Sequence, residues 1–167
     1  MGCSLSFLYS LLSSGSIAII DKSTDRLIEN YHADNLNAYK FKQQGSAYIV
    51  CLFAIRYLGK DSKGYEEFIN LIDKLVSHET VGLNLKIISD ESKAEYSEEV
   101  DINNYKTFLF ETINYEERLK ILEYFFIMKR YVIGKVKYKD ELIRIAVYLK
   151  CKKIDYISLN HKYKEVD

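Results

Sequence analysis

No proline occurs among the 167 residues, and the formal net charge at pH 7 is zero. The lack of proline removes the most common helix breaker. Because 24 basic and 24 acidic residues cancel each other, the composition argues against a protein that binds nucleic acid by neutralising phosphates, and no nucleic-acid partner is expected. The apolar content of 48% is enough to close one core, so the length and composition predict a single compact domain.

Cysteine and histidine are also scarce, with three residues of each type. All six are far apart in the sequence: Cys3, His32, Cys51, His78, Cys151 and His161. This spacing predicts neither a disulfide framework nor a zinc site, and it fits a reducing, cytoplasmic compartment. The sequence also lacks the GxSxG, P-loop, HExxH and GxGxxG motifs, so we expect no enzymatic activity and no catalytic residues.

The first 20 residues, MGCSLSFLYSLLSSGSIAII, contain no charged side chain. Six serines interrupt the apolar run and no basic residue precedes it, so a secretory signal peptide is not predicted. Two interpretations stay open: residues 1–20 form an extra helix that packs on the domain, or they tether the domain to a membrane. The opening MGCSLS also fits the acylation pattern Met-Gly-x-x-x-Ser of eukaryotic proteins, with Cys3 as a second lipid site.

From residue 21 onward, apolar residues recur at helical spacing, and sustained two-residue alternation is absent. We therefore predict that residues 21–167 form one all-α domain of seven or eight helices around one core. The core positions expected from this spacing are Tyr48, Cys51, Leu52, Ile55, Leu58, Tyr65, Phe68, Ile69, Ile72, Leu75, Val76, Tyr105, Phe108, Leu109, Thr112, Leu119, Leu122, Phe125, Phe126, Leu142, Ile145, Ala146, Leu149, Tyr156, Leu159 and Tyr163. The stretch 77–101 has the weakest pattern, with six acids against one lysine between Asp90 and Asp101, and is predicted to be a connection with an acidic, solvated surface. A calcium loop is not predicted, because its carboxylate and glycine spacing is absent.

Two predicted helices are preceded by capping residues. Asp101 and Asn103 are candidate caps for a short helix at residues 105–112. Asn114 followed three residues later by Glu117 has the spacing of a capping box, which predicts that a helix begins directly after Asn114.

The segment RYLGKDSKGYEEFINLIDKL, from Arg56, aligns without a gap with RYVIGKVKYKDELIRIAVYL, from Arg130, at an offset of 74 residues. Arg56 and Tyr57 then match Arg130 and Tyr131, and the apolar residues that follow match at several positions: Phe68 with Leu142, Ile69 with Ile143, Leu71 with Ile145, and Leu75 with Leu149. This match predicts an internal duplication of two helical hairpins that pack on each other.

Acidic residues open the second helix of each predicted hairpin: Glu66 and Glu67 in the first, Asp140 and Glu141 in the second. One interpretation is that they only stabilise the helix N-terminus, where the dipole favours negative charge. The other is that these four carboxylates, together with Asp61, converge and hold a divalent cation, which prefers hard oxygen ligands. A divalent cation is the only cofactor that the sequence suggests.

Several of these residues also occur in a family pattern. Arg118 opens a helix, Gly134 to Val136 form a turn, Asp140 or Glu141 follows, and Ile145, Ala146 and Leu149 close the pattern. In this respect residues 43–163 resemble the TerB-like family, which includes tellurite-resistance TerB proteins and the helical region that precedes the J-domain in DjlA-type co-chaperones. The weaker first repeat of that family is similar to FAIRYLGKDSKGYEEFINLIDKLV of this chain.

The resemblance implies a helical module that acts in a stress response and whose acidic residues bind metal. The chain departs from the family pattern at Ile133, which stands where the family has an aspartate before the turn glycine, and no glycine directly follows Asp61. The sequence contains no HPD tripeptide, so a J-domain is not expected. DjlA-type proteins also place an uncharged segment before the helical domain, which adds support to the tether interpretation of residues 1–20 but leaves the packed extra helix the preferred one.

The function expected from these features is that of a non-catalytic, TerB-like helical module with a scaffold or stress-response role and a protein partner. A divalent-cation sensor is the first alternative, and a small immunity or antitoxin protein is the second. The expected location is the cytoplasm, with the domain free or held at the inner face of a membrane by residues 1–20.

Overall fold

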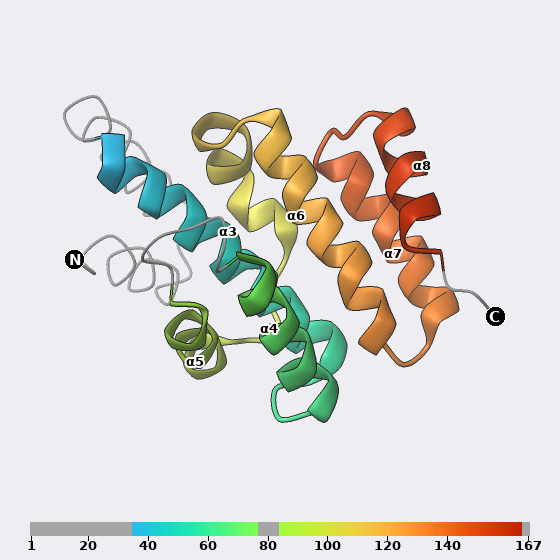
Figure 1. Cartoon of the computed structure of the whole chain (residues 1–167), viewed down its shortest axis with the longest axis horizontal. Helices are drawn as coiled ribbons and strands as arrows, with labels where there is room; N and C mark the ends of the chain where they lie inside the picture. The colour runs from blue at the N-terminus through green and yellow to red at the C-terminus, as the bar shows by residue number, and fades with distance from the viewer. Residues whose placement is uncertain (1–34, 77–83, 165–167) are drawn as a thin grey trace.

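The computed structural model describes residues 35–76 and 84–164, whose regular secondary structure is all helical, with no strand. Counting the π-helical η2 with the six α-helices gives about seven helices, so the predicted all-α class is confirmed for this part of the chain. In Figure 1 α6 lies between α4 and α5 on one side and α7 and α8 on the other. The elements are α3 Asn35–Leu58, α4 Lys63–Val76, α5 Leu85–Glu95, η1 Ile102–Tyr105, η2 Phe108–Thr112, α6 Tyr115–Met128, η3 Lys129–Tyr131, α7 Lys135–Tyr148 and α8 Lys153–Lys162.

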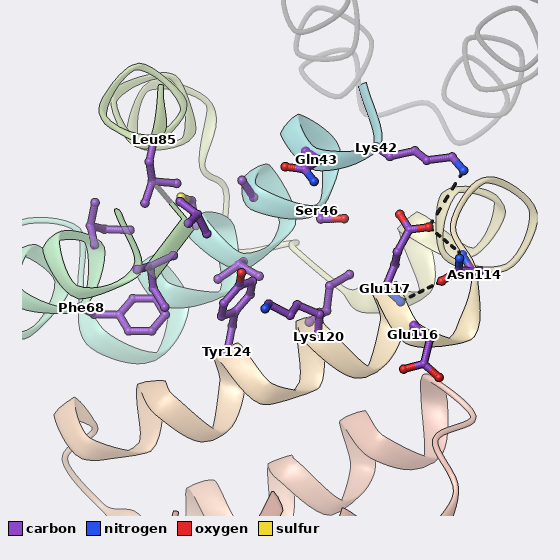
Figure 2. A pocket seen from close by; sticks show the side chains of 17 residues that line it. Lys42, Gln43, Ser46, Phe68, Leu85, Asn114, Glu116, Glu117, Lys120 and Tyr124 are labelled. Carbon is purple, nitrogen blue, oxygen red and sulfur yellow. Dashed lines mark hydrogen bonds and ion pairs between the residues drawn. The ribbon is translucent and has the colours of Figure 1, made fainter. Parts of the chain in front are cut away.

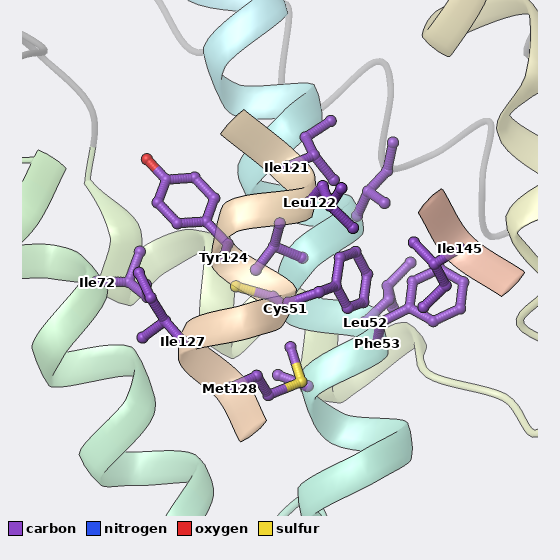
Figure 3. Close-up of a cluster of buried hydrophobic side chains, with 14 of the residues drawn as sticks. Cys51, Leu52, Phe53, Ile72, Ile121, Leu122, Tyr124, Ile127, Met128 and Ile145 are labelled. Carbon is purple, nitrogen blue, oxygen red and sulfur yellow. The ribbon is translucent and has the colours of Figure 1, made fainter. Parts of the chain in front are cut away.

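Helix α3 supplies the centre of the core. Eight consecutive residues, from Tyr48 to Ile55, are buried, although the sequence predicted only one buried face for this segment. The run is apolar on all sides because α4, α5 and α6 all pack against α3. Figure 3 shows Cys51, Leu52 and Phe53 of this helix among side chains from α4, α6 and α7.

Helix α4 follows α3 through a turn and packs on it with an amphipathic face. Ser62 caps the helix, because its hydroxyl oxygen accepts a hydrogen bond from the backbone N–H of Tyr65 at 3.0 Å. The predicted core positions of α4 are buried except Leu75, which is 44% exposed. The acidic residues Glu66 and Glu67 lie on the exposed side.

The prediction that the stretch 77–101 is only a solvated connection is wrong, because α5 occupies residues 85–95. Asn84 caps this helix by accepting a hydrogen bond from the backbone N–H of Ile87 at 3.2 Å. Its buried face holds only two large apolar residues with two serines: Leu85, Ile88, Ser89 and Ser92. The apolar periodicity of α5 is therefore weak, while its acidic residues face outward or lie at the margin.

The capping predictions are confirmed for Asp101 and for the Asn114–Glu117 box, whereas Asn103 lies inside η1 and caps none of the described helices. Asp101 accepts a hydrogen bond from the backbone N–H of Asn103 at 2.9 Å, although the helix it begins is split into the 3₁₀ segment η1 and the π-helix η2. At α6 both hydrogen bonds of the capping box are present: Asn114 accepts from the backbone of Glu117 at 2.9 Å, and Glu117 accepts from the backbone of Asn114 at 3.4 Å.

Helices α7 and α8 both pack on α6. Tyr138 of α7 is buried and donates a hydrogen bond from its hydroxyl to the carbonyl of Phe125 at 2.6 Å. Tyr156 of α8 packs against the ring of Phe126, with 5.4 Å between ring centroids. Helix α8 has no fully buried residue, so it covers the edge of the core and is not part of its centre.

The predicted duplication is not shown by burial. At the offset of 74 residues, Leu75, which is 44% exposed, matches Leu149, which is completely buried. Ile69 is likewise buried where its match Ile143 is exposed. None of the described helices is both long and apolar enough to cross a membrane. Residues 1–20, for which a tether or an extra helix was predicted, lie outside the described residues.

Candidate functional site

A pocket of about 520 Å³ lies where α3, α4, the start of α5 and the start of α6 meet. One end is apolar and the other is charged, as Figure 2 shows: Phe68 and Leu85 lie at the apolar end, and Lys42, Asn114 and Glu117 lie at the charged end. This volume is in the range of sites that bind small molecules or the side chains of a partner.

The apolar end is built from buried side chains of four helices, with Leu85 as the contribution of α5. Val50 and Cys51 come from α3, and Ile121 comes from α6. Helix α4 contributes four further residues to this end, Phe68, Ile69, Ile72 and Val76. All of these side chains are fixed by the core on their other sides, so the apolar end is preformed.

The charged end is positioned by the cap of α6 and the first described side chains of α3. Asn114 and Glu117 are held by the capping box, and the carboxylate of Glu117 lies 4.0 Å from the Lys42 ammonium nitrogen. Both side chains of this ion pair are partly buried. Glu116 and Lys120 complete the rim, which therefore presents both signs of charge within two turns of helix.

Gly45 allows the N-terminal half of α3 to run close to η2. A Cβ atom at this position would lie 2.6 Å from the ring of Phe108, which is closer than a side chain tolerates. The close approach places Lys42, Gln43 and Ser46 beside the capped start of α6. The absence of a side chain at Gly45 therefore permits the close approach of α3 to η2 next to the charged end of the pocket.

The Cys51 thiol, which lines the pocket, is not activated. Burial raises the pKa of this thiol to about 12, and hydrogen bonds with Ser92 and Tyr65 lower the pKa by less than burial raises it. Cys51 therefore stays protonated at neutral pH, and thiols attack as thiolates. Among the described residues that line the pocket there is no histidine to act as a base. The described lining therefore offers neither an ionised thiol nor a histidine, and its other titratable groups are carboxylates, lysines and a tyrosine.

The acidic residues predicted to hold a cation lie on three separate elements. Asp61 is exposed in the turn before α4, and Glu67 of α4 pairs with Lys63 at 3.7 Å. Glu141 accepts a hydrogen bond from the Tyr57 hydroxyl at 3.1 Å and pairs with Arg144 at 2.8 Å. Glu66 and Asp140 are both exposed.

Within residues 35–76 and 84–164, no three His, Cys, Asp or Glu side chains come close enough together to hold a metal ion. The two carboxylate oxygens of Glu141 each have a protein partner, Arg144 for one and the Tyr57 hydroxyl for the other. Cation binding by Asp61, Glu66, Glu67, Asp140 and Glu141 stays a prediction, and calorimetric titration with Ca²⁺, Mg²⁺, Mn²⁺ and Zn²⁺ is its test.

The sequence alone does not predict the pocket. Its residues come from four segments that are far apart in the chain, and most of them read as ordinary core positions. One local signal was present, since the capping box predicted the position of Asn114 and Glu117. The capping box does not indicate that Lys42, more than 70 residues away in the sequence, pairs with Glu117.

Comparisons with protein families, with curated proteins and with solved structures found no match for this chain.

Proposed function

We propose that this protein is a non-catalytic helical binding module, whose pocket between α3, α4 and α6 receives an apolar side chain of a protein partner. The observation that carries the proposal is the polarity of the pocket, in which a preformed apolar end is joined to a rim with both signs of charge. Anchors that fill an apolar pocket and are surrounded by polar contacts provide most of the binding energy in protein interfaces.

The rim favours a protein over a small anion as the occupant. A site for a fatty acid or a phosphate would have an excess of cations, whereas Lys42 and Lys120 here alternate with Glu116 and Glu117. A peptide segment with charged residues of both signs on either side of an aliphatic or aromatic anchor complements this rim. The protonated Cys51 and the lack of a histidine base in the described lining support a binding role over a catalytic one.

The resemblance to the TerB-like family gives the proposal its biological context. It suggests that the module is a scaffold in a stress response, as in tellurite resistance, and that the α3–α4 and α6–α7 hairpins arose by duplication. The support for both points is the sequence pattern around Arg118, Gly134 and Ile145, together with the two hairpins seen in the fold.

A random peptide library displayed on phage, selected on the full chain, provides the probe for this pocket. Two variants test where the selected peptides bind: Ala47→Phe, which places a ring in the pocket, and Lys120→Glu, which changes the charge of the rim. Blocking a central anchor costs roughly 2 kcal/mol or more, so the Kd for the selected peptides is expected to rise about thirty-fold for Ala47→Phe.

The matched control for the rim variant is Lys106→Glu, because Lys106 is exposed directly after η1 and does not line the pocket. Thermal unfolding followed by circular dichroism identifies any variant that has lost the fold. Equal affinity of the selected peptides for the wild type and both folded pocket variants would refute the proposed site, and so would the failure of the library to yield any binding peptide.

A further inference from the structure

The turn between α6 and α7 exposes two aliphatic side chains. Ile133 is 98% exposed and Val136 is 83% exposed, and all five residues from Ile133 to Lys137 face solvent. Val132 is buried and anchors the turn to the core. Gly134 has a φ of +81°, which reverses the chain, and a Cβ at this position would meet nothing within 4 Å. The aliphatic side chains thus stand at an open, well-anchored tip.

This tip is strongly basic although the whole chain is neutral. Between Lys129 and Lys139 there are five basic residues and no acid. Four of the five are exposed: Arg130, Lys135, Lys137 and Lys139. The excess of basic over acidic residues continues beyond the tip, since residues 129–164 contain eleven Lys and Arg against three Asp and Glu. Because the total charge is zero, the rest of the chain carries the compensating negative excess.

The apolar surface of the tip extends along one face of α7. Val136, Ile143 and Val147 are exposed and are separated by seven and four residues, so they lie on one side of the helix. The opposite side, with Tyr138, Leu142 and Ile145, is buried in the core. Asp140 lies within the exposed stripe, and Lys139 and Arg144 flank it.

We propose that the basic tip, defined as Ile133, Val136 and the cations Arg130, Lys135, Lys137 and Lys139, docks on an anionic membrane surface. Exposed aliphatic side chains surrounded by Lys and Arg are the combination that binds such a surface: the apolar groups enter the boundary of the acyl chains, and the cations remain at the lipid phosphates. A nucleic acid would be attracted by the same cations, but it has no use for aliphatic side chains at the apex, where aromatic groups would stack on bases.

The chain contains no tryptophan, so Ile133→Trp introduces a single tryptophan, whose fluorescence reports on the tip. The full-length variant is mixed at low salt with vesicles of phosphatidylcholine that contain about 30% phosphatidylserine as the anionic lipid. The expected result is a shift of the emission to shorter wavelength and quenching by brominated acyl chains, both absent with pure phosphatidylcholine. Ile87→Trp is the matched control, because Ile87 is an exposed isoleucine on α5, outside the basic region.

The electrostatic part is tested by Lys137→Gln/Lys139→Gln against Lys86→Gln/Lys106→Gln, which removes the same charge elsewhere on the surface. Each cation near an anionic surface is worth about five-fold in partitioning, so the tip double variant is expected to bind vesicles about 25-fold more weakly and the control much less so. The fluorescent reporter separates the tip from residues 1–20: an unshifted, unquenched tryptophan in the vesicle-bound Ile133→Trp variant would overturn the proposal. Absence of any binding to anionic vesicles, or equal losses in the two double variants, would overturn it as well.

Discussion

At the scale of single residues, Arg118 connects more parts of the fold than any local rule predicts. Its guanidinium donates hydrogen bonds to the carbonyls of Leu149 at 3.0 Å, Leu109 at 3.4 Å and Ile113 at 3.5 Å. The charged group also lies 5.3 Å from the centre of the Phe110 ring. One side chain of α6 therefore satisfies the ends of η2 and α7.

We expect Arg118→Ala to lower the free energy of unfolding by about 2–3 kcal/mol, because hydrogen bonds from a charged donor are lost and carbonyls are left without partners. Arg118→Lys is expected to recover little of this, since an ammonium group lacks the planar fork that reaches several carbonyls at once. Urea denaturation of both variants measures the difference. Full stability of the lysine variant would show that only the charge matters.

At the scale of the elements, some features depend on residues close together in the sequence and others on contacts between residues far apart in it. The start of α6 follows from Asn114 and Glu117, which are three residues apart, and it was predicted from the sequence for that reason. Helix α5 is not predicted because its apolar periodicity is weak and a polar contact with the preceding helix α4 helps to dock it: the Tyr65 hydroxyl lies 2.8 Å from the Ser89 hydroxyl. The pocket is not predicted either, since Lys42 and Glu117 meet only after α3 and α6 have packed.

The docking of α5 is tested by Tyr65→Phe, which leaves the buried Ser89 hydroxyl without this partner. The expected loss of stability is about 1–3 kcal/mol, the usual cost of an unsatisfied buried polar group. Hydrogen exchange of the α5 amides is expected to become faster than that of α6. Tyr131→Phe is the control, because its ring also packs in the core margin but its hydroxyl makes no hydrogen bond within the described residues.

At the scale of the whole molecule, the fold buries many tyrosines. Burial, with a smaller contribution from Glu141, raises the pKa of Tyr57 to about 12. Burial also raises the pKa of Tyr65, Tyr105 and Tyr138 above the usual value of about 10. Ionisation is thus easier in the unfolded chain than in the folded chain for all four residues.

Because the pKa values of these tyrosines are higher in the folded state, the free energy of unfolding is expected to decrease at alkaline pH. Below pH 10 these tyrosines are protonated in both states, so their contribution to stability is complete. Above pH 10 the unfolded state loses protons while the folded state retains them, and the free energy of unfolding is expected to fall steadily toward pH 12. Urea denaturation at each pH, with tyrosinate absorbance at 295 nm, checks this expectation; flat stability from pH 10 to pH 12 would contradict it.

The pocket between α3, α4 and α6 is the site that we propose for a protein partner. The most direct test of this proposal is a methyl nuclear magnetic resonance titration of the full chain with a peptide selected on it. We expect the largest shifts at Val50, Ile69, Ile72 and Ile121, which line the pocket, while the exposed methyls of Ile143 and Ile157 on α7 and α8 stay unchanged. Shifts confined to α7 and α8, with the pocket methyls unaffected, would contradict it.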